Sequence, residues 1–140
     1  MGRVNHPGTR TANELSYFQS AMLLLCFLVD VTYTIEQPLS SLLDQVPHIV
    51  SVLDYTNAIY DITWLGAYGA FSPKCLKFYA SCRWVSELYR PKPASHPDHQ
   101  LAERTGKSVT GRRAALKASQ VYPELFGQAV AQLFAQAAGL

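Results

Sequence analysis

The chain has 140 residues, 49% of them hydrophobic and 16% charged, with a formal net charge of +2. This is a globular composition, somewhat lean in charge, and the length suits one domain or a large piece of one. Three cysteines without a CxxC pair predict neither a disulfide framework nor a zinc site. The apolar run 21–29 is too short to span a bilayer and lies too far from the N-terminus for a signal peptide. A cytoplasmic or nuclear location is therefore the default, and no membrane partner is expected.

Charge is distributed unevenly along the chain. Residues 1–61 carry two basic and six acidic side chains, a net charge of −4, whereas residues 62–140 carry ten basic and four acidic ones, a net charge of +6. A basic C-terminal half is compatible with a phosphate-rich partner such as a nucleic acid, although a moderate excess more often marks a solvated face. The shortage of surface charge also suggests a missing partner chain or a truncated parent.

Residues 1–10 contain Gly, Pro, Asn and Arg without a period, and we expect a disordered tail there. From Thr11 to about Asp30 the pattern is helical. Apolar residues recur at three- and four-residue steps, which predicts that they form the buried face of a core helix. These residues are Leu15, Phe18, Met22 and Leu25.

A β-branched and aromatic run, Val31 to Ile35, predicts the first strand, which Pro38 ends because proline cannot donate to a sheet ladder. Glu36 and Gln37 would then lie at the carboxyl end of a strand, where ligand-contacting side chains collect in open α/β sheets. They are the candidate catalytic residues. The alternative is that a carboxylate beside the next helix start serves only as an electrostatic cap.

Pro47 is expected to open a short helix, since proline is favoured in the first helical turn. Two further strands are expected at 58–65 and 74–80, and their Gly- and Pro-containing connection predicts antiparallel neighbours. In the last strand Leu76 and Phe78 alternate with Lys77, which predicts a single buried face.

Residues 91–110 contain three prolines within seven residues and predict an exposed loop. Residues 111–140 predict two helices that pack on the core, one over 112–120 and one from Pro123. The whole order predicts an α/β fold in which residues 11–90 form a partial Rossmann-like, methyltransferase-type domain. It would have about three strands flanked by helices, the last two antiparallel, without the βαβ units of a first half.

Two motif-like stretches are rejected. Thr105 to Ser108 resembles the end of a P-loop, but the first glycine of that motif would fall at Leu101 and no strand precedes it. His96 to His99 includes Pro97, which breaks a helical HxxH pattern, and no third metal ligand lies nearby. No metal site is expected, and no Ser/His/Asp arrangement is assignable.

Five basic residues are candidates for contacts with nucleic acid. Lys74 and Lys77 lie around a strand start and would face opposite sides of an extended chain, so that one of them could reach a phosphate. Arg112, Arg113 and Lys117 form a basic turn at a helix start, for which a solvated face is the alternative.

Three segments at suitable spacing resemble the C5-cytosine DNA methyltransferases. Residues 35–38, Ile-Glu-Gln-Pro, are similar to the Glu-Asn-Val motif that this family carries at a strand end. Residues 67–78 resemble its Tyr-Gly-x-Pro-Gln-x-Arg-x-Arg segment, and residues 116–134 resemble its closing helix, Phe-Pro-type turn and final helix. The combined pattern is also similar to algal proteins whose longer members carry a methyltransferase-like half upstream.

The resemblance implies that Glu36 hydrogen-bonds a cytosine ring and helps to make it electrophilic toward a thiolate. It implies that Lys74 and Lys77 are loose counterparts of the Arg-rich segment. It also names S-adenosylmethionine as cofactor, by resemblance only, because the Gly-rich loop and acidic strand end that bind it are absent. Gln37 and Pro38 replace Asn and Val, and no Pro-Cys nucleophile motif precedes Glu36.

Two hypotheses follow. In the first, the chain is a catalytically incomplete methyltransferase-like fragment whose parent acts on a nucleic-acid base. In the second, it is a non-catalytic module that binds nucleic acid through phosphates, or docks a partner chain through an exposed sheet edge and an apolar helix. Steep salt dependence of binding would favour the phosphate route, and salt-insensitive dimerisation would favour the protein partner.

Overall fold

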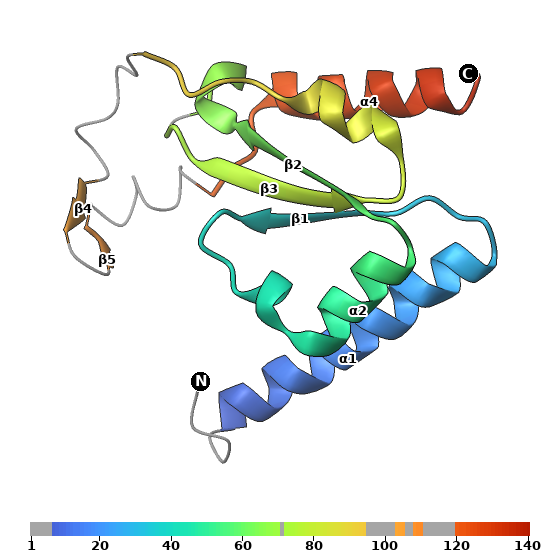
Figure 1. Ribbon diagram of the computed structural model, residues 1–140. Helices are drawn as coiled ribbons and strands as arrows, with labels where there is room; N and C mark the ends of the chain where they lie inside the picture. Colours follow the sequence, from blue (N-terminus) through green and yellow to red (C-terminus); the bar gives the residue numbers. More distant parts are fainter. Residues whose placement is uncertain (1–6, 71, 95–102, 106–107, 111–119) are drawn as a thin grey trace. The chain divides into compact units, whose positions relative to one another are not determined.

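A computed structural model describes residues 7–70, 72–94, 103–105, 108–110 and 120–140 (Figure 1). The chain divides into two compact units. Unit 1 comprises Met1–Tyr60 and Phe78–Arg83, and unit 2 comprises Asp61–Lys77 and Trp84–Leu140.

Three strands form an open sheet in the order β1-β3-β2. They are β1 (Thr34–Pro38), β2 (Ile59–Trp64) and β3 (Cys75–Ala80). The strands are antiparallel, because Ser81 N donates to Tyr33 O beside β1 and Leu65 N donates to Lys74 O beside β2. The predicted mixture of helices and strands, the three strands and the antiparallel pairing of the last two are thus confirmed.

The central strand β3 corrects one prediction. All six of its side chains are buried, including Lys77, so the predicted alternation of one buried face is wrong. A strand that is paired along both edges and covered on both faces buries both sets of side chains, whatever the polarity pattern suggests. β1 and β2 are the edge strands of this sheet.

Two helices of unit 1 begin at prolines. The helices are α1 (Pro7–Leu28) and α2 (Pro47–Tyr55), and a short 3-10 turn, η1 (Leu43–Gln45), precedes α2. Pro47 opens its helix as predicted. Pro7 does the same for α1, so residues 7–10 are helical and the expected tail over 1–10 is wrong for them; a fixed φ and a missing N–H suit the first helical position.

The two helices end in the same way. Asp30 and Asn57 have positive φ values of 56° and 50° and each stands just after a helix. Val31 N donates to Cys26 O at 2.8 Å, and Ala58 N donates to Leu53 O at 2.9 Å. These are the six-to-one bonds of Schellman motifs, which satisfy terminal carbonyl groups and turn the chain sharply into the next strand.

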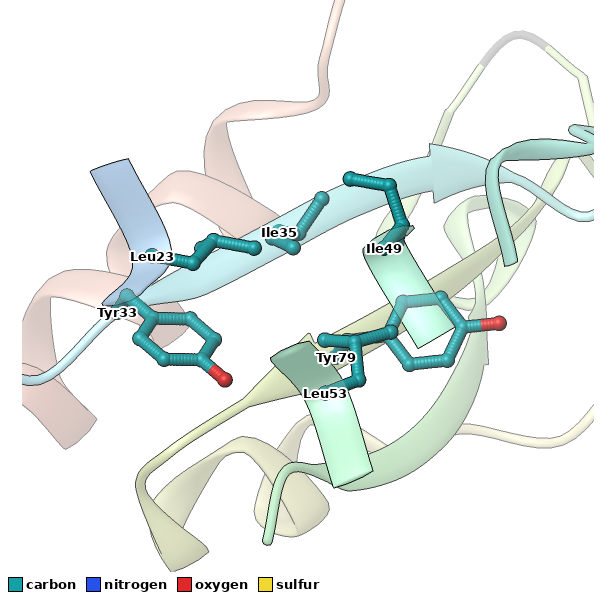
Figure 2. Packing of buried hydrophobic residues seen from close by; sticks show 6 residues of the cluster. All are labelled: Leu23, Tyr33, Ile35, Ile49, Leu53 and Tyr79. Carbon is teal, nitrogen blue, oxygen red and sulfur yellow. The ribbon is translucent and has the colours of Figure 1, made fainter. Parts of the chain in front are cut away.

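The core of unit 1 is a single apolar cluster. Figure 2 shows its side chains converging from α1, from β1 and the residue before it, from α2 and from β3. The cluster consists of Leu23, Tyr33, Ile35, Ile49, Leu53 and Tyr79. Hydrogen bonds fix the two phenols, since Tyr33 pairs with Thr56 and Tyr79 donates to Asp44 Oδ2 at 2.5 Å. Burial raises the pKa values of both phenols, so both remain neutral donors.

The backbone carbonyl of Leu88 joins separate segments of unit 2. It accepts hydrogen bonds from Thr63 Oγ1 at 2.6 Å and from Tyr68 Oη at 2.8 Å. Leu88 closes the 3-10 segment η3 (Arg83–Leu88), and Tyr68 closes η2 (Leu65–Tyr68). Phe126 of α4 (Glu124–Ala137) packs edge-on against Tyr68, with ring centroids 5.3 Å apart.

The C-terminal part differs from the expected loop over 91–110. Residues 103–105 and 108–110 form a hairpin, β4 (Glu103–Thr105) with β5 (Ser108–Thr110), in which Arg104 pairs with Val109. Alternation of polar and β-branched residues is too short there to signal strands. The helix expected over 112–120 lies outside the described residues except for residue 120, whereas the helix expected after Pro123 is confirmed as α4.

Candidate functional site

The candidate carboxylate lies within β1 rather than beyond it. Glu36 and Gln37 are the third and fourth of the five residues of β1, because the strand begins at Thr34 and extends to Pro38. The predicted strand, Val31 to Ile35, was therefore placed too early. Glu36 is half-buried, with its Oε1 atom shielded from solvent, so a ligand would reach it only through restricted access.

The Gln37 amide is held by the turn that follows β1. Ser41 Oγ donates to Gln37 Oε1 at 2.9 Å and accepts a hydrogen bond from Leu43 N at 3.2 Å. Ser41 N also donates to Pro38 O at 2.8 Å. Gln37 thus fixes the exit from β1 toward η1, which is a structural role.

None of the three cysteines, all of them described, is arranged as a nucleophile. Cys75 and Cys82 are buried, and burial raises the pKa of the Cys75 thiol. A reactive cysteine needs the opposite, a lowered pKa in an accessible, electropositive environment. Cys26 is half-buried and packs against the unit 1 cluster.

The candidate phosphate-binding residues are dispersed. Lys77 is 4% exposed within β3, and Lys74 Nζ lies 5.2 Å from the ring centroid of Tyr122, a cation–π contact. Arg112, Arg113 and Lys117 lie outside the described residues. Arg90 and Lys92 also stack on aromatic rings of unit 2. These four basic side chains of unit 2 are therefore buried or in contact with aromatic rings.

A serine–histidine pair, which the sequence did not reveal, joins α1 to α2. Ser16 Oγ lies 2.9 Å from His48 Nε2, and the Tyr17 ring stacks on the imidazole with centroids 4.0 Å apart. The Ser16 hydroxyl donates its proton to Asn13 O at 2.8 Å. With that proton on Asn13 O, the tautomer that satisfies both contacts has His48 Nε2 donating to Ser16 Oγ. The pair is a structural contact between two helices.

The surface of α1 reverses the sequence prediction. The residues expected to be buried are exposed, by 42% to 66%, and we call them, together with Val29, the outer seam. The outer seam consists of Leu15, Phe18, Met22, Leu25 and Val29. The side of α1 that faces the unit 1 core is instead the inner stripe, which consists of Ser16, Ser20 and Leu23.

The two stripes are about 150° apart around the helix, given 100° per residue. Serine is small enough to let α1 approach α2 closely, and both inner hydroxyls bond backbone carbonyls one turn back, Ser20 Oγ to Ser16 O at 3.0 Å. A signal for this reversal exists in the sequence. Only Arg10 and Glu14 are charged over the whole of α1, so no face of this helix is polar enough to be the ordinary solvent face.

No family model matches the chain, and no curated protein or solved structure matches it either. Within the part of the chain that the structure describes, no group of three or more His, Cys, Asp or Glu side chains could hold a metal ion. None of the described helices has the length and apolar character needed to cross a bilayer. The feature with the clearest chemical consequence is the outer seam.

Proposed function

We propose that this protein is a non-catalytic interaction module that pairs with a second copy of itself through the outer seam of α1. The observation that carries this proposal is the exposure of four large apolar side chains on one side of α1, continued by Val29 just after its end. Contiguous apolar patches on soluble proteins mark interaction sites, because exposing them to water is unfavourable.

The spacing of the outer seam specifies the shape of its partner. Its residues follow one another at steps of three, four, three and four, which is the a/d pattern of a heptad repeat. A seam of this kind accepts the side chains of a second helix that crosses at a small angle. The complementary surface is therefore another α-helix with the same spacing, and the chain itself supplies one.

Charge favours a second copy over an acidic or basic partner. No charged residue lies between Glu14 and Asp30, so two seams can meet around a twofold axis without repulsion between like charges. An uncharged seam also offers nothing to select an oppositely charged surface. A lipid surface fits less well, because helices that lie in a membrane interface carry a Lys- and Arg-rich polar face and α1 has only Arg10.

The size of the seam predicts a reversible dimer. Side chains of this size have on the order of 150–200 Å² of surface each, so five half-exposed ones offer roughly 400–500 Å² per copy. Two copies would bury about 800–1,000 Å², which is below the roughly 1,200–2,000 Å² of stable specific interfaces and within the range of weak, transient ones. A dissociation constant of roughly 1–50 μM is therefore expected.

The test is sedimentation of the purified chain over a range from about 1 to 200 μM, which brackets that constant. The wild-type chain should shift from monomer to dimer, with little dependence on salt because the contact is apolar. Phe18→Glu should weaken the dimer at least about 30-fold, since it places a charge in the centre of the apolar contact. Leu42→Glu is the matched control: Leu42 is equally exposed but lies outside the seam, and the dimer should survive.

Three results would contradict the proposal. A folded wild-type chain that stays monomeric at the highest concentration would assign the seam to some other chain or to a lipid surface. A dimer unaffected by Phe18→Glu would place the contact elsewhere. Association that falls steeply with salt would point to charged contacts, including nucleic-acid phosphates carried through purification.

A second candidate function rests on the half-buried carboxylate of Glu36 in β1 and on the resemblance described above. In this alternative the chain is part of a Rossmann-like, methyltransferase-type protein in which Glu36 recognises a nucleic-acid base. The chain alone would be catalytically incomplete, so calorimetry with S-adenosylmethionine should detect no binding. Clear binding by the folded chain would reveal a cofactor site and would favour this alternative in a catalytically competent form.

A further inference from the structure

A pocket of about 380 Å³ opens on unit 1 beside α2. Its walls come from η1, α2, the start of β2 and the end of β3, so it lies wholly within one unit. The volume falls within the range of small-molecule sites, roughly 300–1,000 Å³. Two apolar residues of α2, Val50 and Leu53, line part of the wall.

Two tyrosine rings form the aromatic part of the pocket. The Tyr60 and Tyr79 centroids are 5.3 Å apart with the rings tilted by 44°. Tyr79 is buried and fixed by its 2.5 Å hydrogen bond to Asp44 Oδ2, whereas Tyr60 is 53% exposed and forms the outer wall. One ring is thus immobilised and the other is open to an incoming group. Aromatic faces carry negative potential and attract cations.

The charged side chains of the pocket are negative as well. Asp44 and Asp54 both line it, and no basic side chain does. A metal ion is a poor occupant, because calcium and magnesium require about six oxygen ligands and much of this wall is carbon. A group with a positive head and an alkyl body suits both halves of the wall, since the carboxylates and ring faces attract the head and the α2 side chains bury the body.

We propose that this pocket binds a primary alkylammonium group, either a small amine or the side chain of a lysine. The proposal is independent of the outer seam, since no seam residue lines the pocket. The ammonium head would lie between the Asp54 carboxylate and the Tyr60 ring, and the alkyl chain would lie along Leu53.

The experiment is a titration of the full ¹⁵N-labelled chain with n-butylammonium chloride at constant ionic strength, followed by NMR. Saturable shifts should appear at the amides of Asp54, Ala58 and Tyr60, with a dissociation constant of roughly 1–10 mM for so small a probe. Butan-1-ol, which has the same chain without the charge, should bind at least about tenfold more weakly. Nα-acetyl-lysine-N-methylamide distinguishes the two sources, because tighter binding than butylammonium would identify a lysine side chain.

Three variants assign the binding to the pocket, and all three positions lie on the surface, where substitution leaves the fold intact. Asp54→Asn and Tyr60→Leu should each weaken butylammonium binding by roughly twofold to fivefold. Asp30→Asn is the control: it removes the same charge outside the pocket, at a positive-φ position that asparagine tolerates, and should leave binding unchanged.

The proposal is overturned if no saturable shift appears up to roughly 50 mM butylammonium, a range well above the expected constant. Equal binding of butan-1-ol would show that the pocket is an apolar groove that does not recognise cations. If Asp30→Asn and Asp54→Asn weaken butylammonium binding equally, the ligand is attracted by the overall charge of unit 1 and does not occupy a specific site.

Discussion

The two helices of unit 1 bury their side chains by opposite rules. α2 follows the usual arrangement: Ile49 and Leu53 face the core, and Ser51 and Asp54 face solvent. α1 directs two serines and one leucine at the core and leaves its outer seam exposed. The two helices nevertheless pack against each other within unit 1. Unit 1 thus covers one side of α1 and leaves an apolar side exposed.

The largest expected effect tests this contrast with a matched pair of truncations. Ile49→Ala removes a fully buried side chain and should lower the free energy of unfolding by about 2–4 kcal/mol. Leu25→Ala removes a similar group from the outer seam and should change it by less than about 0.5 kcal/mol in the monomer. Chemical denaturation at a protein concentration too low for dimerisation measures both free energies. Equal losses would contradict the different burial of the two side chains.

A second prediction concerns the hydrogen bond that ties β3 to η1, just before α2. Tyr79→Phe leaves the Asp44 carboxylate without this donor and should lower the free energy of unfolding by about 1.5–3 kcal/mol at pH 7. Tyr60→Phe is the control, because Tyr60 is exposed and should contribute almost nothing. Similar small effects for both would mean that the Tyr79–Asp44 bond is not formed in solution.

The same phenol predicts a pH dependence. Burial, and next the hydrogen bond to Asp44, raise the pKa of Tyr79 above its ordinary value of 10.0. The folded chain therefore keeps this proton at a pH at which the unfolded chain releases it. The contribution is fully present below pH 10 and is lost above it, by up to about 1.4 kcal/mol per pH unit. Tyr79→Phe should flatten the decline between pH 10 and 12, and an unchanged slope would contradict the assignment.

The smallest expected effect tests the packing of the inner stripe. Ser16→Ala removes the hydroxyl that joins Asn13 O and His48, and should lower the free energy of unfolding by about 0.5–1.5 kcal/mol. Ser51→Ala removes a hydroxyl that bonds a backbone carbonyl one turn back in α2, but on the exposed face, and should be neutral or slightly stabilising. If the two variants behave alike, the serine face of α1 is not packed as described.

The sequence predicted those features that depend on local chemistry. Pro47 opens α2, the end of α1 falls near Asp30, and strands form close to 59–64 and 75–80, because proline geometry and β-branched runs act over a few residues. Which face of α1 is buried depends on what it meets across the fold. The inner serines are buried because they face α2, which lies later in the chain. Periodicity alone instead predicts burial of the more apolar face.

The candidate site shows the same limit. Glu36 was identified as a carboxylate near the end of the first strand, but the register that places it inside β1 is set by pairing with β3 about 45 residues later, as in the bond from Ser81 N to Tyr33 O. The pocket beside Tyr60 and Tyr79 was not predicted, since it draws residues from four separate segments. Long-range pairing leaves no short motif in the sequence.

The most direct measurement of the central claim is the rate of thiol labelling at two positions of α1. In a Cys26→Ala background, where the two remaining native thiols are buried, Phe18→Cys reports the outer seam and Ser20→Cys the inner stripe. In dilute solution position 18 should react at least about tenfold faster than position 20. At high concentration position 18 should become protected as the seams pair, while position 20 stays unchanged. Faster labelling at position 20 in dilute solution would show that α1 buries its outer seam and exposes its inner stripe. This result would also contradict the proposed dimer.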